Sequence, residues 1–258
     1  MSVVRGEQSI IQVWSAATSP GVPGDLECRC ERWLTAEERQ RADRFRVATS
    51  RNQHVVGRGM ARRLLADRDT PGRSIDGDAP AIDPSEIVFA YTPHGKPFVI
   101  GPRTLIRPFN VAHTDGMVLF VDGRSGWVGV DVERISRRTD VALAERYFAK
   151  PEVEYVLDQP DDDSRRRAFL RVWTLKEAFI KAIGTGLSMP LADFAFDEID
   201  AQRPRVRMLN PKLGDGENWQ FITFSPADGY IAAVAQNEPD RSAPLDLRLR
   251  RFETLLSL

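Results

Sequence analysis

The sequence predicts an α+β fold made of two similar lobes. Strand-like and helical segments are mixed without the regular β-α-β alternation of a doubly wound parallel sheet. Each half of the chain carries a comparable mixture, and a break at residues 123–126 separates the halves. We therefore expect an N-terminal lobe over residues 1–122, a C-terminal lobe over residues 123–238 and a tail over residues 239–258.

In the first half, the start of one helix is clearly marked. Thr35 is followed three residues later by Glu38, which is the spacing of a capping box, so a helix is expected over residues 34–45. The other expected elements are strands at 9–16, 86–91 and within 109–123, a helix through 51–68, and turns at 19–25, 69–84 and 92–97. Both helical segments are rich in arginine.

In the second half, a strand is expected at residues 127–135, and the long helix that includes residues 171–183 is expected to end at a glycine pair. The remaining expected elements are helices at 142–148 and 151–159, strands at 193–199, 205–209, 218–225 and 230–236, and a short amphipathic helix at the end of the tail.

Composition limits the classes of function. The 258 residues carry a net charge of −1, so overall charge gives no reason to expect nucleic acid or membrane as a partner. No apolar run approaches the length of a membrane span, and the first residues lack the apolar core of a signal peptide. The C-R-C spacing of Cys28 and Cys30 suits neither zinc nor a redox pair, so both are expected as reduced thiols in a cytoplasmic protein.

The strand VGVDVERI at residues 128–135 alternates. Its three valines take one face, and Gly129, Asp131 and Glu133 take the other. Carboxylates two residues apart on one strand face lie roughly 6–7 Å apart, which suits a single hard cation such as Mg²⁺. A solvated acidic face on an edge strand is the alternative. Gly129 is interpreted as leaving room for a ligand beside the two acids.

The helix RVWTLKEAFIKAI adds a third acid and two lysines. Trp173, Glu177 and Lys181 follow one helical stripe, whereas Val172, Leu175, Phe179 and Ile183 follow another that is expected in the core. Glu177 can complete a set of three carboxylates, and Lys176 and Lys181 can supply positive charge to phosphate groups. An exposed i, i+4 ion pair between Glu177 and Lys181 is the alternative.

These residues form a recognisable pattern. G-V-D-V-E at 129–133, followed by W-T-L-K-E-A-F-I-K-A-I-G-T-G at 173–186, resembles the motifs of the 4′-phosphopantetheinyl transferases, in particular the larger pseudo-dimeric class typified by the surfactin-synthetase activator. G-K-P at 95–97 and F-N-V-A-H-T at 109–114 resemble two further motifs of that family. The resemblance covers about residues 34–236.

The resemblance implies two lobes, each a small antiparallel sheet packed with helices, with the active site at their interface. It implies Mg²⁺-dependent transfer of the phosphopantetheine arm of coenzyme A to a serine of an apo acyl or peptidyl carrier protein. Fatty-acid, polyketide and nonribosomal-peptide carriers all fit. A monomer is expected, with coenzyme A and the carrier as partners.

The resemblance also implies residue roles. Asp131, Glu133 and Glu177 would hold Mg²⁺, and Lys181 would contact the diphosphate of coenzyme A. Asp131, Glu177 and Lys181 would be the catalytic groups. The residues expected to bind coenzyme A are Arg41, Lys96, His113, Lys176 and Lys181.

The chain departs from the family pattern at three positions. Ala112 replaces the usual serine before His113, Thr114 replaces the serine after it, and Ala178 follows Glu177 where many members have serine. None of these changes affects the expected metal ligands.

Two other functions fit parts of the pattern. Paired acids with lysine also form the sites of metal-dependent nucleases and phosphodiesterases, and the arginine-rich helices could contact a nucleic-acid backbone. A non-catalytic module that binds carrier proteins is the third interpretation.

Overall fold

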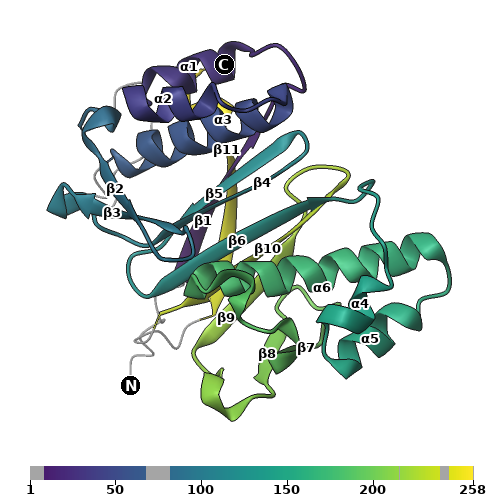
Figure 1. Ribbon diagram of the computed structural model, residues 1–258. Helices are drawn as coiled ribbons and strands as arrows, with labels where there is room; N and C mark the ends of the chain where they lie inside the picture. The colour runs from purple at the N-terminus through teal and green to yellow at the C-terminus, as the bar shows by residue number, and fades with distance from the viewer. Residues whose placement is uncertain (1–8, 68–81, 215, 239–243, 258) are drawn as a thin grey trace, which may run out of the picture.

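The computed structural model describes residues 9–67, 82–214, 216–238 and 244–257. Figure 1 shows α1–α3 on one side, sheets in the middle and α6 on the other side. The main sheets are a four-stranded one of order β11-β1-β5-β4 and a three-stranded one of order β6-β10-β9. The expected α+β class, with small sheets packed against helices, is confirmed.

The four-stranded sheet is built from both ends of the chain. Its strands are β1 (Ser9–Ala17), β4 (Phe109–Thr114), β5 (Met117–Asp122) and β11 (Leu245–Arg251). β11 lies parallel to β1, whereas the β1–β5 and β4–β5 pairs are antiparallel. The tail was expected to contribute only a terminal helix, but it also supplies this edge strand before the short helix α7 (Phe252–Leu255).

The outer face of this sheet is covered by helices α1 (Asp25–Arg32), α2 (Ala36–Ala42) and α3 (Ala48–Leu65). The predicted capping box at Thr35 is confirmed, since its side chain accepts a hydrogen bond from the amide of Glu38. Helix α1 was not expected from the sequence. Trp14, Met60 and Phe120 belong to the core between sheet and helices, and Phe252 of the tail completes it.

A small hairpin lies between the helices and the rest of the first sheet in the sequence. Residues 68–81 before it lie outside the described residues, and they include most of the loop expected at 69–84. The hairpin consists of β2 (Val88–Tyr91) and β3 (Pro97–Gly101), flanked by single 3₁₀ turns at Pro84–Glu86 and Arg103–Leu105. The turn between its strands, at 92–97, carries Lys96 as the sequence indicated.

The second half repeats the arrangement of a long helix on a small sheet. Its main sheet is formed by β6 (Trp127–Arg134), β9 (Trp219–Phe224) and β10 (Tyr230–Asn237), all antiparallel. The other elements are α4 (Leu143–Tyr147), α5 (Lys150–Leu157), α6 (Asp162–Ile183), β7 (Phe194–Asp197), β8 (Arg205–Met208) and 3₁₀ turns at Gly186–Ser188, Leu191–Asp193 and Pro211–Leu213.

Helix α6 begins nine residues before the segment 171–183 that carries its motif. It begins at Asp162, where the side chain of Asp161 accepts a hydrogen bond from the amide of Ser164 at 2.8 Å. It ends at Gly184, whose φ of 83° is the left-handed conformation expected of a glycine that caps a helix. Within the described ranges, no helix combines the length and apolar character needed to cross a bilayer.

The two main sheets pack against each other through apolar side chains. Val13, Leu119 and Val121 of the first sheet belong to the same buried cluster as Val130 and Val234 of the second. Because β6 is an edge strand of its sheet and contacts β4, the strand that carries Asp131 and Glu133 lies at the seam between the two halves.

Candidate active site

The two acids of β6 are buried. Asp131 is 5% exposed and Glu133 is 7% exposed, so the alternative of a solvated acidic strand face is wrong. A buried carboxylate is costly unless a positive charge or hydrogen-bond donors accompany it. The surroundings of these two acids therefore determine what the site can bind.

Gly129 has a packing role that differs from the one expected. A Cβ atom added there would lie 2.1 Å from the carbonyl oxygen of Ala178 and 2.5 Å from the amide nitrogen of Ala182. The space beside Gly129 is thus filled by the backbone of α6, not left for a ligand. The glycine lets the helix approach β6 closely enough for side chains of both elements to share one site.

Helix α6 places Lys181 against β6. Its Nζ atom lies 2.5 Å from Oδ1 of Asp131, so this lysine pairs with an acid on the strand. Glu177, one turn earlier, lies close enough to Glu133 and Lys181 for their charges to influence its pKa. The predicted helical stripe and strand face therefore converge. Trp173 of the same stripe stacks on Phe169, with ring centroids 5.9 Å apart, and serves as packing.

The acids perturb one another's proton affinity. Burial raises the pKa of Asp131 to about 7, although the charge of Lys181 opposes the shift. Burial also raises the pKa of Glu177, and the charge of Glu133 adds to this effect. Burial would lower the pKa of Lys181, but Asp131, Glu177 and Glu133 outweigh it and raise the pKa. The lysine is therefore held in its charged form.

The acid cluster has the chemistry that fits a divalent cation. Three carboxylates face one lysine, and Oδ2 of Asp131 is buried without a hydrogen-bond partner. Carboxylate oxygens are the ligands that Mg²⁺ prefers. Among the residues that the structure describes, no three Asp, Glu, His or Cys side chains already surround a metal-sized space. Lys181 instead occupies one oxygen of Asp131.

Strand β4 brings the other lobe to the same site. His113 lies on this strand, and burial lowers the pKa of its imidazole, with the charge of Lys181 adding to the shift. The hydroxyl of Thr114 donates to Oε2 of Glu133 at 3.5 Å, so the threonine retains a hydroxyl directed at the site. No role was expected for Arg137, four residues after Glu133, yet its guanidinium pairs with that carboxylate. The only sequence signal for this ion pair is the spacing of four residues between the opposite charges of Glu133 and Arg137.

Asn110 was also missed. Its Oδ1 atom accepts a hydrogen bond from the amide of Val130 at 2.9 Å, and the residue is buried. Because β6 is an edge strand, this amide has no strand partner on that side, and the side chain of Asn110 supplies one from across the seam. Asn110 lies within F-N-V-A-H-T, so its motif was visible but its role was not.

Lys176 is not in the site. It is fully buried, and its Nζ atom lies 2.7 Å from Oε2 of Glu152 and donates to the carbonyl oxygens of Leu191 and Phe194, each at 2.7 Å. Aromatic rings of Phe148 and Phe194 flank the ammonium. In this placement the ammonium of Lys176 is enclosed in the core of the second half, which does not favour the expected contact with coenzyme A.

Lys96 lies at the seam, but its ammonium is engaged. Nζ donates to the carbonyl oxygens of Ala182 at 2.7 Å and Val128 at 3.2 Å. These bonds compete with the expected contact to the nucleotide end of coenzyme A. Burial lowers the pKa of Lys96 to about 8.

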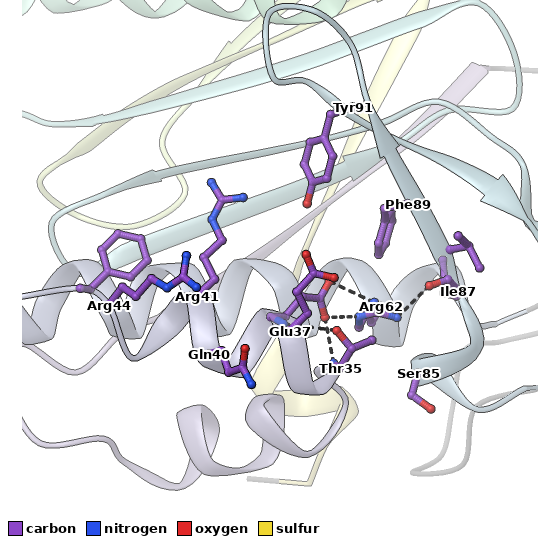
Figure 2. Close-up of a pocket in the computed structure, with 13 residues that line it drawn as sticks. Thr35, Glu37, Gln40, Arg41, Arg44, Arg62, Ser85, Ile87, Phe89 and Tyr91 are labelled. Carbon is purple, nitrogen blue, oxygen red and sulfur yellow. Dashed lines mark hydrogen bonds and ion pairs between the residues drawn. The ribbon is translucent and has the colours of Figure 1, made fainter.

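Arg41 lies in a separate pocket of about 770 Å³ in the first half. Helix α2 and strand β2 form its walls, and Figure 2 shows the side chains of Arg41 and Tyr91 extending into the space between these elements, whereas Arg62 is hydrogen-bonded beside Ile87. Arg41 and Arg44 supply positive charge, and Phe89 and Tyr91 supply aromatic surface. Such a lining suits a ligand that combines phosphate with a flat ring.

One wall of this pocket is fixed by ion pairs around Glu38. Its carboxylate pairs with Arg62 at 2.7 Å and with Arg58 at 3.2 Å, and Arg58 also donates to the hydroxyl of Tyr91 at 2.6 Å. Burial would raise the pKa of Glu38, but its bonds to Arg62 and Thr35 and the charge of Arg58 lower it. The wall is therefore preformed.

His54 lies beside this pocket, with its ring centroid 5.2 Å from that of Phe45. Burial lowers its pKa to about 4, and the charges of Arg58, Arg41 and His113 add to the shift. The charges of Arg41 and His113 thus both influence the pKa of His54, and the charge of Lys181 influences the pKa of His113.

A family model matches part of the second half of the chain. The model of the 4′-phosphopantetheinyl transferase superfamily matches residues 127–235, which include the acidic strand and helix α6.

Relatives match over most of the chain. A 4′-phosphopantetheinyl transferase of Bacillus pumilus, psf-1, is 32% identical over 87% of this chain and 87% of its own. The 4′-phosphopantetheinyl transferase HetI of Nostoc is 29% identical over 78% of each chain, and the 4′-phosphopantetheinyl transferase Sfp of Bacillus subtilis is 27% identical over 87% of this chain and 90% of its own.

Among solved structures, the holo-[acyl-carrier-protein] synthase of Thermotoga maritima is 27% identical, with a TM-score of 0.33. That match spans 43% of this chain and 62% of the synthase, less than two thirds of its length.

Proposed function

The chain belongs to the 4′-phosphopantetheinyl transferase superfamily, and we propose that it transfers the 4′-phosphopantetheine group of coenzyme A to a serine hydroxyl of an apo carrier protein. Adenosine 3′,5′-bisphosphate is the other product. The observation that supports this proposal most directly is the convergence of Asp131, Glu133, Glu177 and Lys181 on one buried site at the seam.

Asp131, Glu133 and Glu177 would hold Mg²⁺. The unpartnered oxygen of Asp131 and the excess of negative charge in the cluster support this assignment. When bound, the metal would neutralise charge on the diphosphate of coenzyme A. Lys181 pairs with Oδ1 of Asp131, so Oδ2 is the oxygen that would be open to the metal, and the phosphate oxygens of coenzyme A would offer the ammonium another partner.

The residues of the chain divide the remaining work. The serine oxygen attacks the phosphorus that bears the pantetheine arm, and the bond from that phosphorus to the bridging oxygen of the diphosphate breaks. Glu177 would accept the serine proton as the general base of the cluster. Lys181 stabilises the negative charge on the departing bisphosphate. His113 and Arg41 bind phosphate groups of coenzyme A.

The pocket beside Arg41 is the proposed place for the nucleotide end of coenzyme A. A mixture of arginine and aromatic side chains can contact both phosphate and adenine. We further propose lobes over residues 1–122 and 123–238, with the tail 239–258 returning to the first lobe. The protein is proposed to act as a cytoplasmic monomer on acyl or peptidyl carriers, with no nucleic acid or membrane as partner.

The decisive experiment is intact-protein mass spectrometry of apo carrier domains after incubation with the protein, coenzyme A and Mg²⁺. A gain of about 340 Da, the mass of the transferred group, that EDTA prevents is the expected result. Carrier binding without a gain in mass, across fatty-acid, polyketide and nonribosomal-peptide carriers, would contradict the proposal and favour a binding module. Cleavage of DNA or RNA with Mg²⁺ alone would favour a nuclease.

The role of Glu177 is tested by Glu177→Gln, which keeps the size of the side chain and removes its charge. We expect the variant to fold and to lose transfer activity, because it lacks both the base and a metal ligand. Wild-type activity in this variant would contradict its assignment. Glu154→Gln, on the exposed part of α5, is a matched control that should retain activity.

A further inference from the structure

Lys96 reaches from one half of the protein into the other. It lies in the hairpin turn of the first half, yet both described hydrogen bonds of its ammonium end on the second half, at the carbonyl oxygens of Ala182 and Val128. The donor distances are 2.7 Å and 3.2 Å. A single side chain therefore joins the hairpin to two elements across the seam.

Those two elements carry the acid cluster. Ala182 directly follows Lys181 in the last turn of α6, and Val128 lies three residues before Asp131 on β6. The pair formed by Lys181 and Asp131 is thus held between the same two elements that Lys96 connects. A change in their spacing at this end would alter the distance between the lysine and the acid.

Among the described hydrogen bonds, no backbone amide outside their own helix or sheet donates to either acceptor. Carbonyl oxygens in the last turn of a helix have no amide donor within the helix, and a positive charge there also interacts favourably with the helix dipole. Val128 shares with Val130 the outer edge of β6, where Asn110 binds the amide of Val130. Lys96 and Asn110 together complete this edge from across the seam.

The contact is built into the local structure. Gly184, which caps α6, leaves space for the stem of Lys96, since a Cβ atom there would lie 3.2 Å from its Cδ atom. The turn is fixed by hydrogen bonds from the amide of Thr92 to the carbonyl of Lys96 at 2.9 Å and from the amide of Lys96 to Oγ1 of Thr92 at 3.1 Å. The lysine is therefore held at both ends.

We propose that Lys96 is a positioning residue that clamps the C-terminal end of α6 to β6 and so sets the geometry of Lys181 and Asp131. This inference rests on the proposed transferase function and assigns Lys96 a role different from the nucleotide contact expected from the sequence. Burial lowers the pKa of Lys96, which agrees with an ammonium enclosed beside the carbonyl oxygens of Ala182 and Val128.

The kinetic test is Lys96→Met, which keeps the apolar stem against Gly184 and removes the donor. Misplacement of catalytic groups by about 1 Å can cost about a hundredfold in rate, so we expect kcat to fall about tenfold to a hundredfold. The KM for coenzyme A should stay within about twofold, because no ligand contact is lost. Lys150→Met, at a lysine whose side chain is 88% exposed, is the control and should change neither constant.

Lys96→Arg should retain more of kcat than Lys96→Met, because a guanidinium can still donate to the two carbonyls. A rise in the KM for coenzyme A with unchanged kcat in Lys96→Met would overturn the proposal and restore the nucleotide contact. Unchanged kinetics would overturn it as well. If Lys96→Met does not fold, Lys96→Gln is compared in the same way.

Amide hydrogen exchange provides a readout that needs no activity. In Lys96→Met, amides at the C-terminal end of α6, residues 180–186, should exchange faster than in the wild type, while the centre of α6 stays protected. Equal exchange at that end would overturn the clamp even if transfer is observed. If the wild-type protein transfers nothing, the proposed function is wrong. If Lys96→Met still exchanges faster than the wild type at residues 180–186, the clamp nevertheless holds.

Discussion

Replacing Lys176 with methionine separates its structural role from the phosphate contact that its position in W-T-L-K-E suggests. The substitution removes an ammonium from a fully buried site where it contacts Glu152, Leu191 and Phe194, each at 2.7 Å. Glu152 also accepts hydrogen bonds from the amides of Ala149 and Phe196, each at 3.0 Å. One lysine therefore helps to hold α5, α6 and the start of β7 together.

The expected loss of stability is large. Removing one partner of a buried ion pair costs about 3–5 kcal/mol, since the other charge stays buried and uncompensated. A domain is commonly stable by about 5–15 kcal/mol, so Lys176→Met should remove a substantial fraction of the total. Burial raises the pKa of Glu152 and lowers that of Lys176, which agrees with a pair held against a desolvation penalty.

The assay is urea denaturation followed by circular dichroism, with the KM for coenzyme A measured on folded protein. We expect a much lower urea midpoint and an unchanged KM. The double variant Lys176→Met with Glu152→Gln should be more stable than the single one, because no unpaired charge remains in the core. An unchanged midpoint together with a raised KM would refute this reasoning and return Lys176 to the phosphates.

Three further predictions concern the seam and its surroundings. Gly129→Ala should destabilise the protein and abolish transfer, since its Cβ would collide with α6; normal activity would show that the helix can move away at no cost. Lys181→Met should increase the rise in melting temperature that Mg²⁺ causes without coenzyme A, because no ammonium competes for Asp131; an equal rise in both proteins would contradict this. The pKa of His54 lies at about 4 in the folded state, below its ordinary value of 6.5, so the unfolded chain takes up a proton first and stability should fall as the pH drops from 6.5 through 4. His54→Gln should weaken this pH dependence of the urea midpoint, and an identical dependence in both proteins would exclude His54 as its source.

The acid cluster was predictable because two short periodicities determine it. Alternation along β6 put Asp131 and Glu133 on one face, and the helical repeat put Glu177 and Lys181 on one stripe. Lys176 directly precedes Glu177, and one residue step turns a helix by about 100°, so Lys176 points away from the stripe that carries Glu177 and Lys181. Its burial away from the site follows from this geometry. Because Lys176 belongs to the same motif as Glu177 and Lys181, the motif suggested that it also contacts phosphate, whereas its ammonium lies in the core beside Glu152.

The contribution of the tail was harder to predict. Leu245, Leu247 and Leu249 alternate with charged residues, which is the pattern of a strand, but a short segment with mixed charge also fits an amphipathic helix. The partner of this strand, β1, lies at the opposite end of the chain, and parallel pairing at such separation leaves no local signal. Periodicity can identify a strand without identifying its neighbour.

The polar contacts across the seam explain why the site depends on more than its acids. Oδ1 of Asn110 accepts from Val130, Nζ of Lys96 donates to Val128, and the hydroxyl of Tyr230 donates to the carbonyl of Asp115 at 3.0 Å. Each joins one half to the other, and the first two end on the strand that carries the acids. Because the apolar core between the sheets is not directional, these hydrogen bonds fix the register of one sheet against the other. Substitutions at the seam should therefore affect kcat even where they touch neither coenzyme A nor the carrier, since a catalytic pair shared between two elements is only as well placed as the contacts that align them.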